Sequence, residues 1–168
     1  MATPLKVEIV TPERVLLSTE AEEVSMRTDA GEIAFLARHE DFIGAADITV
    51  VRISGAVQGG DADARRDLAA AVHGGFVHVD QDANQVRILA GVAELGEEVD
   101  VARARRALAE AEAASAPGEG SPAAEAGATS GGARRGAALA LLEAGSPAAA
   151  ARRARVRLEA AGAREPAG

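Results

Sequence analysis

The chain has 168 residues, and close to half of them are hydrophobic, which is enough for one domain with a core and an appendage. Its only aromatic residues are three Phe, so the core has to be built from Val, Ile, Leu and Ala. Cysteine is absent, which excludes disulfides and thiolate chemistry. Residues 1–99 carry 8 basic and 18 acidic groups, whereas residues 100–168 carry 10 and 8. The acidic first half argues against a nucleic-acid ligand.

The sequence contains no pattern that predicts catalysis or membrane insertion. Lys6 is the only lysine, so a phosphate-binding Walker A loop is excluded, and no nucleophile elbow is present. The three histidines, His39, His73 and His78, lack the short spacing of a metal site. No apolar run approaches the roughly 18 residues that span a bilayer, and no signal peptide is expected. We therefore expect a soluble, cytoplasmic, non-catalytic subunit.

Short strands are predicted along the first half of the chain, because apolar and polar residues alternate there. Residues 37–47 are expected to be irregular. The segment 62–71 reads as either a short helix or a strand, and we favour a strand because strand signals lie on both sides. Strands at intervals of about ten residues, separated by Gly and Pro, are typical of an antiparallel sandwich or barrel. The alternating stretches are residues 5–9, 15–17, 23–27, 32–36 and 48–53.

The clearest part of the pattern begins at Gly74 and Gly75, whose freedom from Cβ atoms suggests a bend at the start of a strand. A strand over residues 76–79 and another over residues 86–90 follow. The polar residues 80–85 between them predict a hairpin with a loop of more than two residues.

From Val101 the apolar period becomes that of a helix. Glu97, Glu98 and Asp100 precede it, and carboxylates there stabilise a helix start. The helix carries a thin stripe of small side chains, which predicts close but weak packing against another element. The stripe consists of Val101, Ala104, Leu108 and Ala111.

A second helix is predicted after Ser146 as N-cap and Pro147 at the first helical position. Its stripe of Ala151, Ala154, Leu158 and Ala161 matches the first, so the two helices are expected to pair as an antiparallel hairpin. We divide the chain into a β-sandwich domain over residues 1–96, a first helix over 97–114, a flexible Ala/Gly/Pro-rich linker with a short helix over 115–145, and a last helix and tail over 146–168.

Two charged groups allow two interpretations each. Four arginines of the last helix form either a solvated face or a docking surface for an acidic partner; they are Arg152, Arg153, Arg155 and Arg157. Glu94, Asp100 and Arg103 form either a capping and salt-bridge cluster or an anion and ribose site at a helix start.

Four segments, in this order and spacing, resemble the epsilon subunit of the F-type, proton-translocating ATP synthase. The resemblance covers about residues 5–114, with a looser match at 146–161. The segments are Gly31-Glu32-Ile33 with His39 seven residues after Glu32, the block from Val72 to Val79 around Gly74-Gly75-Phe76-Val77, the run Val86-x-Ile88-Leu89-Ala90, and Val99-Asp100-x-x-Arg103-Ala104.

The resemblance implies a mainly β fold, a ten-stranded sandwich followed by an α-helical arm of helix-loop-helix form. It implies a rotor subunit of the central stalk that couples gamma to the c-ring at the cytoplasmic side of the cell membrane, without inserting into it. By position, Glu32 and His39 match the surface near the c-ring. The helices are expected to fold onto the sandwich or to extend toward the alpha and beta subunits, where Arg152, Arg153, Arg155 and Arg157 would block ATP hydrolysis.

The resemblance also implies a nucleotide site in some bacterial members, which maps here to Glu94, Asp100, Arg103 and Ala104. A further arginine of those members falls at Glu110, whose charge would repel phosphate. We therefore expect no obligatory cofactor and at most weak regulatory ATP. The alternative function is a free-standing nucleotide-binding sensor module.

Overall fold

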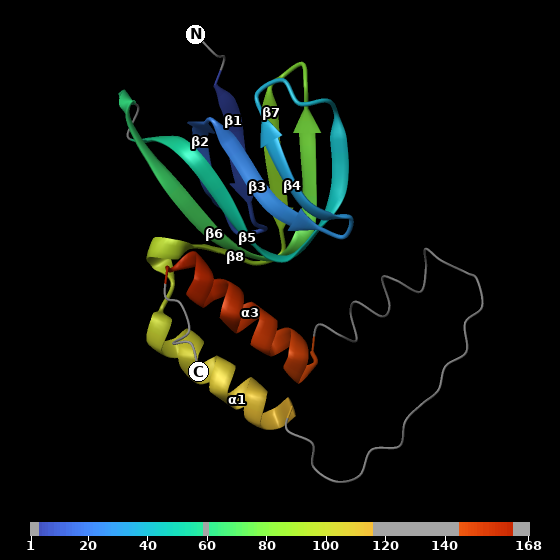
Figure 1. Cartoon of the computed structure of the whole chain (residues 1–168), viewed down its shortest axis with the longest axis vertical. Coiled ribbons are helices and arrows are strands. Elements are labelled where there is room, and N and C mark those ends of the chain that lie inside the picture. The colour runs from blue at the N-terminus through green and yellow to red at the C-terminus, as the bar shows by residue number, and fades with distance from the viewer. Residues whose placement is uncertain (1–3, 59–60, 116–144, 163–168) are drawn as a thin grey trace, which may run out of the picture.

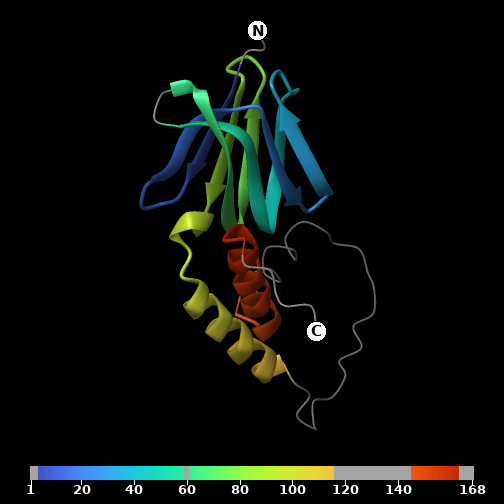
Figure 2. The ribbon, with the colours of Figure 1, turned by 60° about the vertical axis from the view of Figure 1, so that its left-hand side comes forward.

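The computed structural model describes residues 4–58, 61–115 and 145–162, and it consists of a β-sandwich followed by two helices. The helices project from one end of the sandwich, opposite the start of β1 (Figure 1 and Figure 2). The strands are β1 (Leu5–Val10), β2 (Val15–Ala21), β3 (Glu23–Thr28), β4 (Gly31–Leu36), β5 (Phe42–Gln58), β6 (Asp61–Asp80), β7 (Gln85–Ala90) and β8 (Ala93–Leu95).

The eight strands form one continuous sheet in the order β2-β1-β7-β6-β5-β3-β4, with β8 paired to β6. Neighbouring strands are antiparallel, except that β1 and β7 run parallel. The sheet folds back on itself, so that its two halves face each other across the core (Figure 1). The predicted sandwich with its mainly antiparallel pairing is therefore present.

The fold in the sheet comes from β5 and β6, which bend together at the end nearest the helices (Figure 1). The bend lies near Gly74, which has a φ of 85°, and Gly75, which has a φ of 151°. The alternation of inward-facing and outward-facing side chains along β6 shifts by one residue at the bend. Ala70 and Val72 point into the core before the bend, whereas Val77 and Val79 point into it afterwards. Each long strand thus contributes to both layers of the sandwich.

This bend explains three corrections to the sequence-based expectations. The sandwich has eight strands, not the ten implied by the resemblance, because β5 and β6 continue through the bend and occupy the places of four shorter strands. Residues 37–47 are not irregular throughout, since β5 already begins at Phe42. Gly74 and Gly75 lie inside β6 and do not start a strand.

Other local predictions are confirmed. The segment 62–71 belongs to β6, as favoured, and residues 76–79 pair with β7 as a hairpin. Asp80 pairs with Gln85 across a loop in which Asn84 adopts a φ of 50°. The core consists mainly of Val, Ile, Leu and Ala, together with Met26 and with Phe35, the largest fully buried side chain. The predicted composition of the core is therefore correct.

Within the described residues, two helices and one short 3-10 turn follow the sheet. The turn η1 (Gly96–Glu98) leads to α1 (Val101–Ser115), and α3 (Pro147–Ala160) comes later in the chain. Ser146 caps α3 by accepting a hydrogen bond from the Ala149 N–H, as predicted. Neither described helix is long and apolar enough to cross a membrane. The predicted linker over 115–145 lies outside the described residues apart from its first and last residue, and its predicted short helix lies wholly outside them.

Gly75→Ala is expected to lower the free energy of unfolding by about 3 kcal/mol. A Cβ at this position would lie 2.1 Å from the Leu89 carbonyl oxygen of β7, and the backbone conformation is one that L side chains rarely adopt. Urea unfolding followed by circular dichroism measures the loss. Gly91→Ala is the matched control, because nothing lies within 4 Å of the added methyl. Equal stability of the two variants would contradict the role of Gly75 in the bend.

Candidate functional site

The helical arm, meaning α1 and α3, is attached to the sandwich by the last turns of α3. Val156 and Ala160 of α3 pack against Val50 of β5 and Ala71 of β6, which lie on the outer face of the sheet close to the bend. These side chains are few and mostly small. Since hydrophobic stabilisation scales with the apolar area removed from water, this apolar contact between α3 and the sandwich contributes modestly to docking.

Gly96 allows the arm to approach this closely. A Cβ there would lie 2.1 Å from the Ala160 carbonyl oxygen and 3.2 Å from that of Ala69. The end of α3 therefore rests directly on the backbone of η1 and β6, which no residue other than glycine would permit without a shift of α3.

Ion pairs surround the small apolar contact between α3 and the sandwich. The Arg157 guanidinium bonds the Glu94 carboxylate of β8 through Nη2 at 2.8 Å and through Nε at 3.1 and 3.2 Å. Arg152 pairs with Asp47 at 2.7 Å, and Glu159 of α3 pairs with Arg52 of β5. The Arg157–Glu94 pair is the least exposed, with 28% and 34% of the two side chains accessible. Electrostatic contacts therefore help to set how α3 sits on the sandwich.

The two helices pack against each other through the predicted stripes. Because α1 begins and α3 ends beside the sandwich, they run antiparallel (Figure 1 and Figure 2). Arg155 of α3 pairs with Glu112 of α1 at 2.7 Å, which adds a charged contact to the seam. The seam residues are Ala104, Leu108 and Ala111 of α1, with Ala151, Ala154 and Leu158 of α3.

The four arginines predicted to dock onto an acidic partner lie on α3, and at least three of them have carboxylate partners among the described residues. Arg152, Arg155 and Arg157 bond Asp47, Glu112 and Glu94 respectively. Arg153 lies close enough to His73 to affect its titration. The folded arm thus uses internal carboxylates where the resemblance implies carboxylates of another subunit, and the docking role stays a prediction.

The four residues predicted to bind a nucleotide do not converge on one open site. Asp100 accepts a hydrogen bond from the Arg103 N–H at 2.9 Å, the capping geometry of the alternative interpretation. Ala104 is buried between α1 and α3, and the Glu94 carboxylate is bonded to Arg157. A nucleotide at Glu94 would have to displace Arg157 first. Nucleotide binding remains a prediction.

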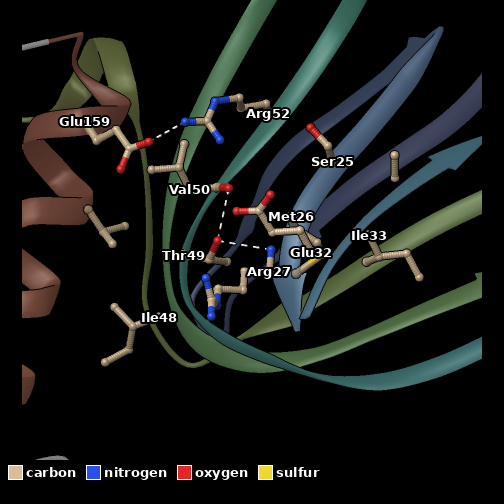
Figure 3. A pocket seen from close by; sticks show the side chains of 12 residues that line it. Ser25, Met26, Arg27, Glu32, Ile33, Ile48, Thr49, Val50, Arg52 and Glu159 are labelled. Atoms are coloured by element: carbon tan, nitrogen blue, oxygen red, sulfur yellow. Dashed lines mark hydrogen bonds and ion pairs between the residues drawn. The ribbon is translucent and has the colours of Figure 1, made fainter. Parts of the chain in front are cut away.

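The two residues predicted to lie near the c-ring stand at opposite ends of β4. Glu32 lies near the arm, where it lines a pocket of about 420 Å³ between the β3–β4–β5 surface and α3 (Figure 3). His39 follows the other end of the strand. Its Nδ1 lies 2.8 Å from the Glu40 carbonyl oxygen. Its ring packs edge-on against that of Phe35, with the two ring centroids 5.1 Å apart. The fold does not bring Glu32 and His39 together, and their contact role is untested.

An apolar stripe that the sequence pattern did not predict lies on the outer face of the other half of the sheet. Ile43 of β5, Phe76 of β6 and Leu89 of β7 are 74%, 60% and 44% exposed. Phe76 pairs directly with Leu89 in the β6–β7 ladder. Ile43 pairs with His78, two residues after Phe76 on β6, so Ile43 is a diagonal neighbour of Phe76 on the same face of the sheet. We call this set the apolar stripe. One signal was available, since Leu89 falls on the polar side of the alternation in residues 86–90.

His73 of β6 lies beside the contact between α3 and the sandwich. Burial lowers the pKa of His73 from 6.5 to about 4, with Arg157 and Arg153 lowering it further and Glu94 raising it. The imidazole is therefore neutral near pH 7. No sequence signal marked this residue, because its surroundings come from β8 and α3.

Comparison with known proteins finds similarity over most of the described chain. The family model for the beta-sandwich domain of the ATP synthase delta/epsilon chain matches residues 4–96. The ATP synthase epsilon chain of Thermobifida fusca is 45% identical over 109 residues, which cover 64% of this chain and 74% of that protein. The epsilon chain of Carboxydothermus hydrogenoformans is 40% identical over 108 residues, covering 64% and 73%.

A solved structure agrees with these sequence matches. A chain of the Euglena gracilis mitochondrial ATP synthase, determined as an OSCP/F1/c-ring complex, superposes with a TM-score of 0.56 at 25% identity. The match covers 71% of each chain.

Arg157→Gln is expected to weaken docking of α3 on the sandwich by about 1 kcal/mol, because it removes a half-buried ion pair. Faster hydrogen exchange of the α3 amides would report the change. Arg155→Gln is the matched control, since Arg155 ties α3 to α1 and not to the sandwich. Exchange that rises equally in both variants would show that the Glu94 pair has no special part in docking.

Proposed function

The chain belongs to the delta/epsilon family of ATP synthase subunits, and we propose that it works as a rotor subunit of the central stalk that couples gamma to the c-ring. It is a non-catalytic epsilon chain of the synthase, and its association with a membrane is through that complex. We place it on the cytoplasmic side of the cell membrane. Residues 1–96 would form the binding domain, and the helices after it a regulatory arm.

The apolar stripe carries the proposal. Soluble proteins usually keep large aliphatic and aromatic side chains apart on their surfaces, and contiguous ones mark contact sites. Ile43, Phe76 and Leu89 stand on three neighbouring strands of a rigid sheet, away from the surface that α3 occupies. We assign this stripe to gamma, because an interface that transmits torque needs a desolvated patch on a stiff support.

The c-ring contact is assigned to the sandwich as well, through the surfaces at Glu32 and His39. Because these residues lie at opposite ends of β4, a single small loop of the ring would contact only one of them. Glu32 is exposed beside α3, whereas His39 lies beyond the far end of the strand. A substitution at Glu32 and one at His39 would therefore distinguish which end of the sandwich faces the ring.

The arm supplies the second part of the proposal, an inhibitory action on ATP hydrolysis. In the folded arm, Arg152, Arg155 and Arg157 are paired with carboxylates of the same chain. If the arm extends, those ion pairs are exchanged for pairs with acidic residues of the beta subunits. Such an exchange changes the number of ion pairs little, so a small bias can decide between the two positions.

Phe76→Glu is expected to weaken binding to purified gamma by at least about 2 kcal/mol, roughly thirtyfold, because it places a charge in the centre of the apolar stripe. Isothermal titration measures the affinity, and circular dichroism checks the fold. Val15→Glu is the matched control. Val15 is also exposed, but it lies on the edge strand β2. Unchanged affinity of Phe76→Glu would remove the assignment of the stripe to gamma.

The inhibitory action is tested by ATP hydrolysis in an assembly of the catalytic head with gamma. The full chain is expected to lower the rate, and a chain ending at Val99 to bind gamma without inhibiting. Gly96→Ala should inhibit more strongly than the full chain, since it pushes the end of α3 off the sandwich without changing any charge. If all three bind and none inhibits, the arm is only structural.

A further inference from the structure

His73 occupies an unusual position where the arm meets the sandwich. It lies two residues after Ala71, which packs against Ala160 of α3. The backbone N–H of His73 bonds the Val92 carbonyl oxygen, which fixes the strand. Its Nε2 atom is buried, yet it has no hydrogen-bond partner among the residues that the structure describes. Buried polar atoms without partners are rare in native proteins and call for an explanation.

The charges around His73 come from the elements that pack over β6. Arg157 and Arg153 face it from α3, and Glu94 faces it from β8. On β5 its partner in the ladder is the uncharged Ile48. Glu94 is the one carboxylate among these groups, and it already accepts bonds from Nε and Nη2 of Arg157. A protonated imidazole would therefore be a further cation beside two arginines, and the Glu94 carboxylate near it is already bonded to Arg157.

We propose that His73 is an acid-sensitive latch, in which protonation of the imidazole releases α3 from the sandwich. A proton on Nε2 would place a charged N–H under the helix, where the described residues provide it with no hydrogen-bond partner. If Glu94 turned to accept it, Arg157 would lose its partner, and α3 would lose its most buried tie to the sandwich. Both routes weaken docking, and neither affects the α1–α3 seam.

The direction in which pH changes docking follows from the pKa of His73 in the docked and in the released form. With α3 in place, the pKa of His73 is about 4, and on a freed outer face it returns toward 6.5. The released form then binds a proton more tightly than the docked form. Docking is at full strength above pH 6.5 and weakens as the pH falls from 6.5 toward 4. From about pH 7.5 to pH 5.5 the ratio of docked to released chain should fall about tenfold.

The latch is a property of the isolated chain, and only its consequence for ATP hydrolysis rests on the proposed function. If the arm inhibits when extended, acidification of the surrounding solution would favour the inhibited state. A measurement of docking alone tests the latch, because it requires neither gamma nor the catalytic head. Failure of the inhibitory role would leave the result of that measurement unchanged.

The first test is an NMR titration of the His73 ring in the full chain and in the Gly96→Ala variant, which displaces α3 without altering charge. The pKa of His73 is expected near 4 in the full chain and close to 6.5 in the variant. Gly91→Ala, whose added methyl has no atom within 4 Å, should show the same His73 pKa as the unsubstituted chain. The same His73 pKa in the unsubstituted chain and in the Gly96→Ala variant, with docking of α3 shown to be weaker in the variant, would overturn the proposal.

The second test follows docking directly by energy transfer between dyes on introduced cysteines. The chain has no cysteine of its own, so Asp82→Cys in the β6–β7 turn and Ala148→Cys at the outer end of α3 provide unique positions. In the Gly96→Ala background, where both forms are populated, acid should lower transfer. His73→Gln should abolish this response, and His78→Gln on the same strand should keep it. A response that survives His73→Gln would refute the latch.

Discussion

The close packing of Gly75 against the backbone of β7 fixes the point where β5 and β6 bend, and the rest of the structure depends on that bend. Because glycine has no Cβ, β6 can lie this close to the backbone of β7 at the bend. The two long strands therefore turn together there and fold one sheet into two layers. The bend also changes which residues face inward. Ala71 and His73 face out on one side of it, and Phe76 on the other.

The outer surface of the same pair of strands therefore has two different uses. Near the bend, Val50 and Ala71 receive α3, whereas farther along Ile43 and Phe76 remain exposed. One rigid hairpin thus supports both the internal docking of the arm and the surface that we assign to gamma. The two contacts are mechanically connected by the β5–β6 ladder, which runs through the bend from Phe42–Val79 to Gln58–Asp61.

The arm is held by contacts that are individually weak. Small side chains bury little area, and ion pairs with partly exposed members contribute little net stability because they are screened and cost side-chain entropy. Arg157 and Glu94 form the least exposed of these ion pairs, and His73 lies beside them. A contact of this kind holds a helix in a defined position yet can be released by a small change in charge, which suits a regulatory element.

The sequence by itself determined the local features. Alternation predicted most strands, and the cap at Ser146 and the matching Ala and Leu stripes predicted α3 and its packing on α1, because these signals involve residues a few positions apart. The tertiary structure alone decided the phase change at Gly75, the eight strands instead of ten, and the exposure of Phe76. It also decided that Glu94 pairs with Arg157, 63 residues away, and that Glu32 and His39 lie apart. These features depend on which distant strands and helices meet, and no local period or cap encodes that.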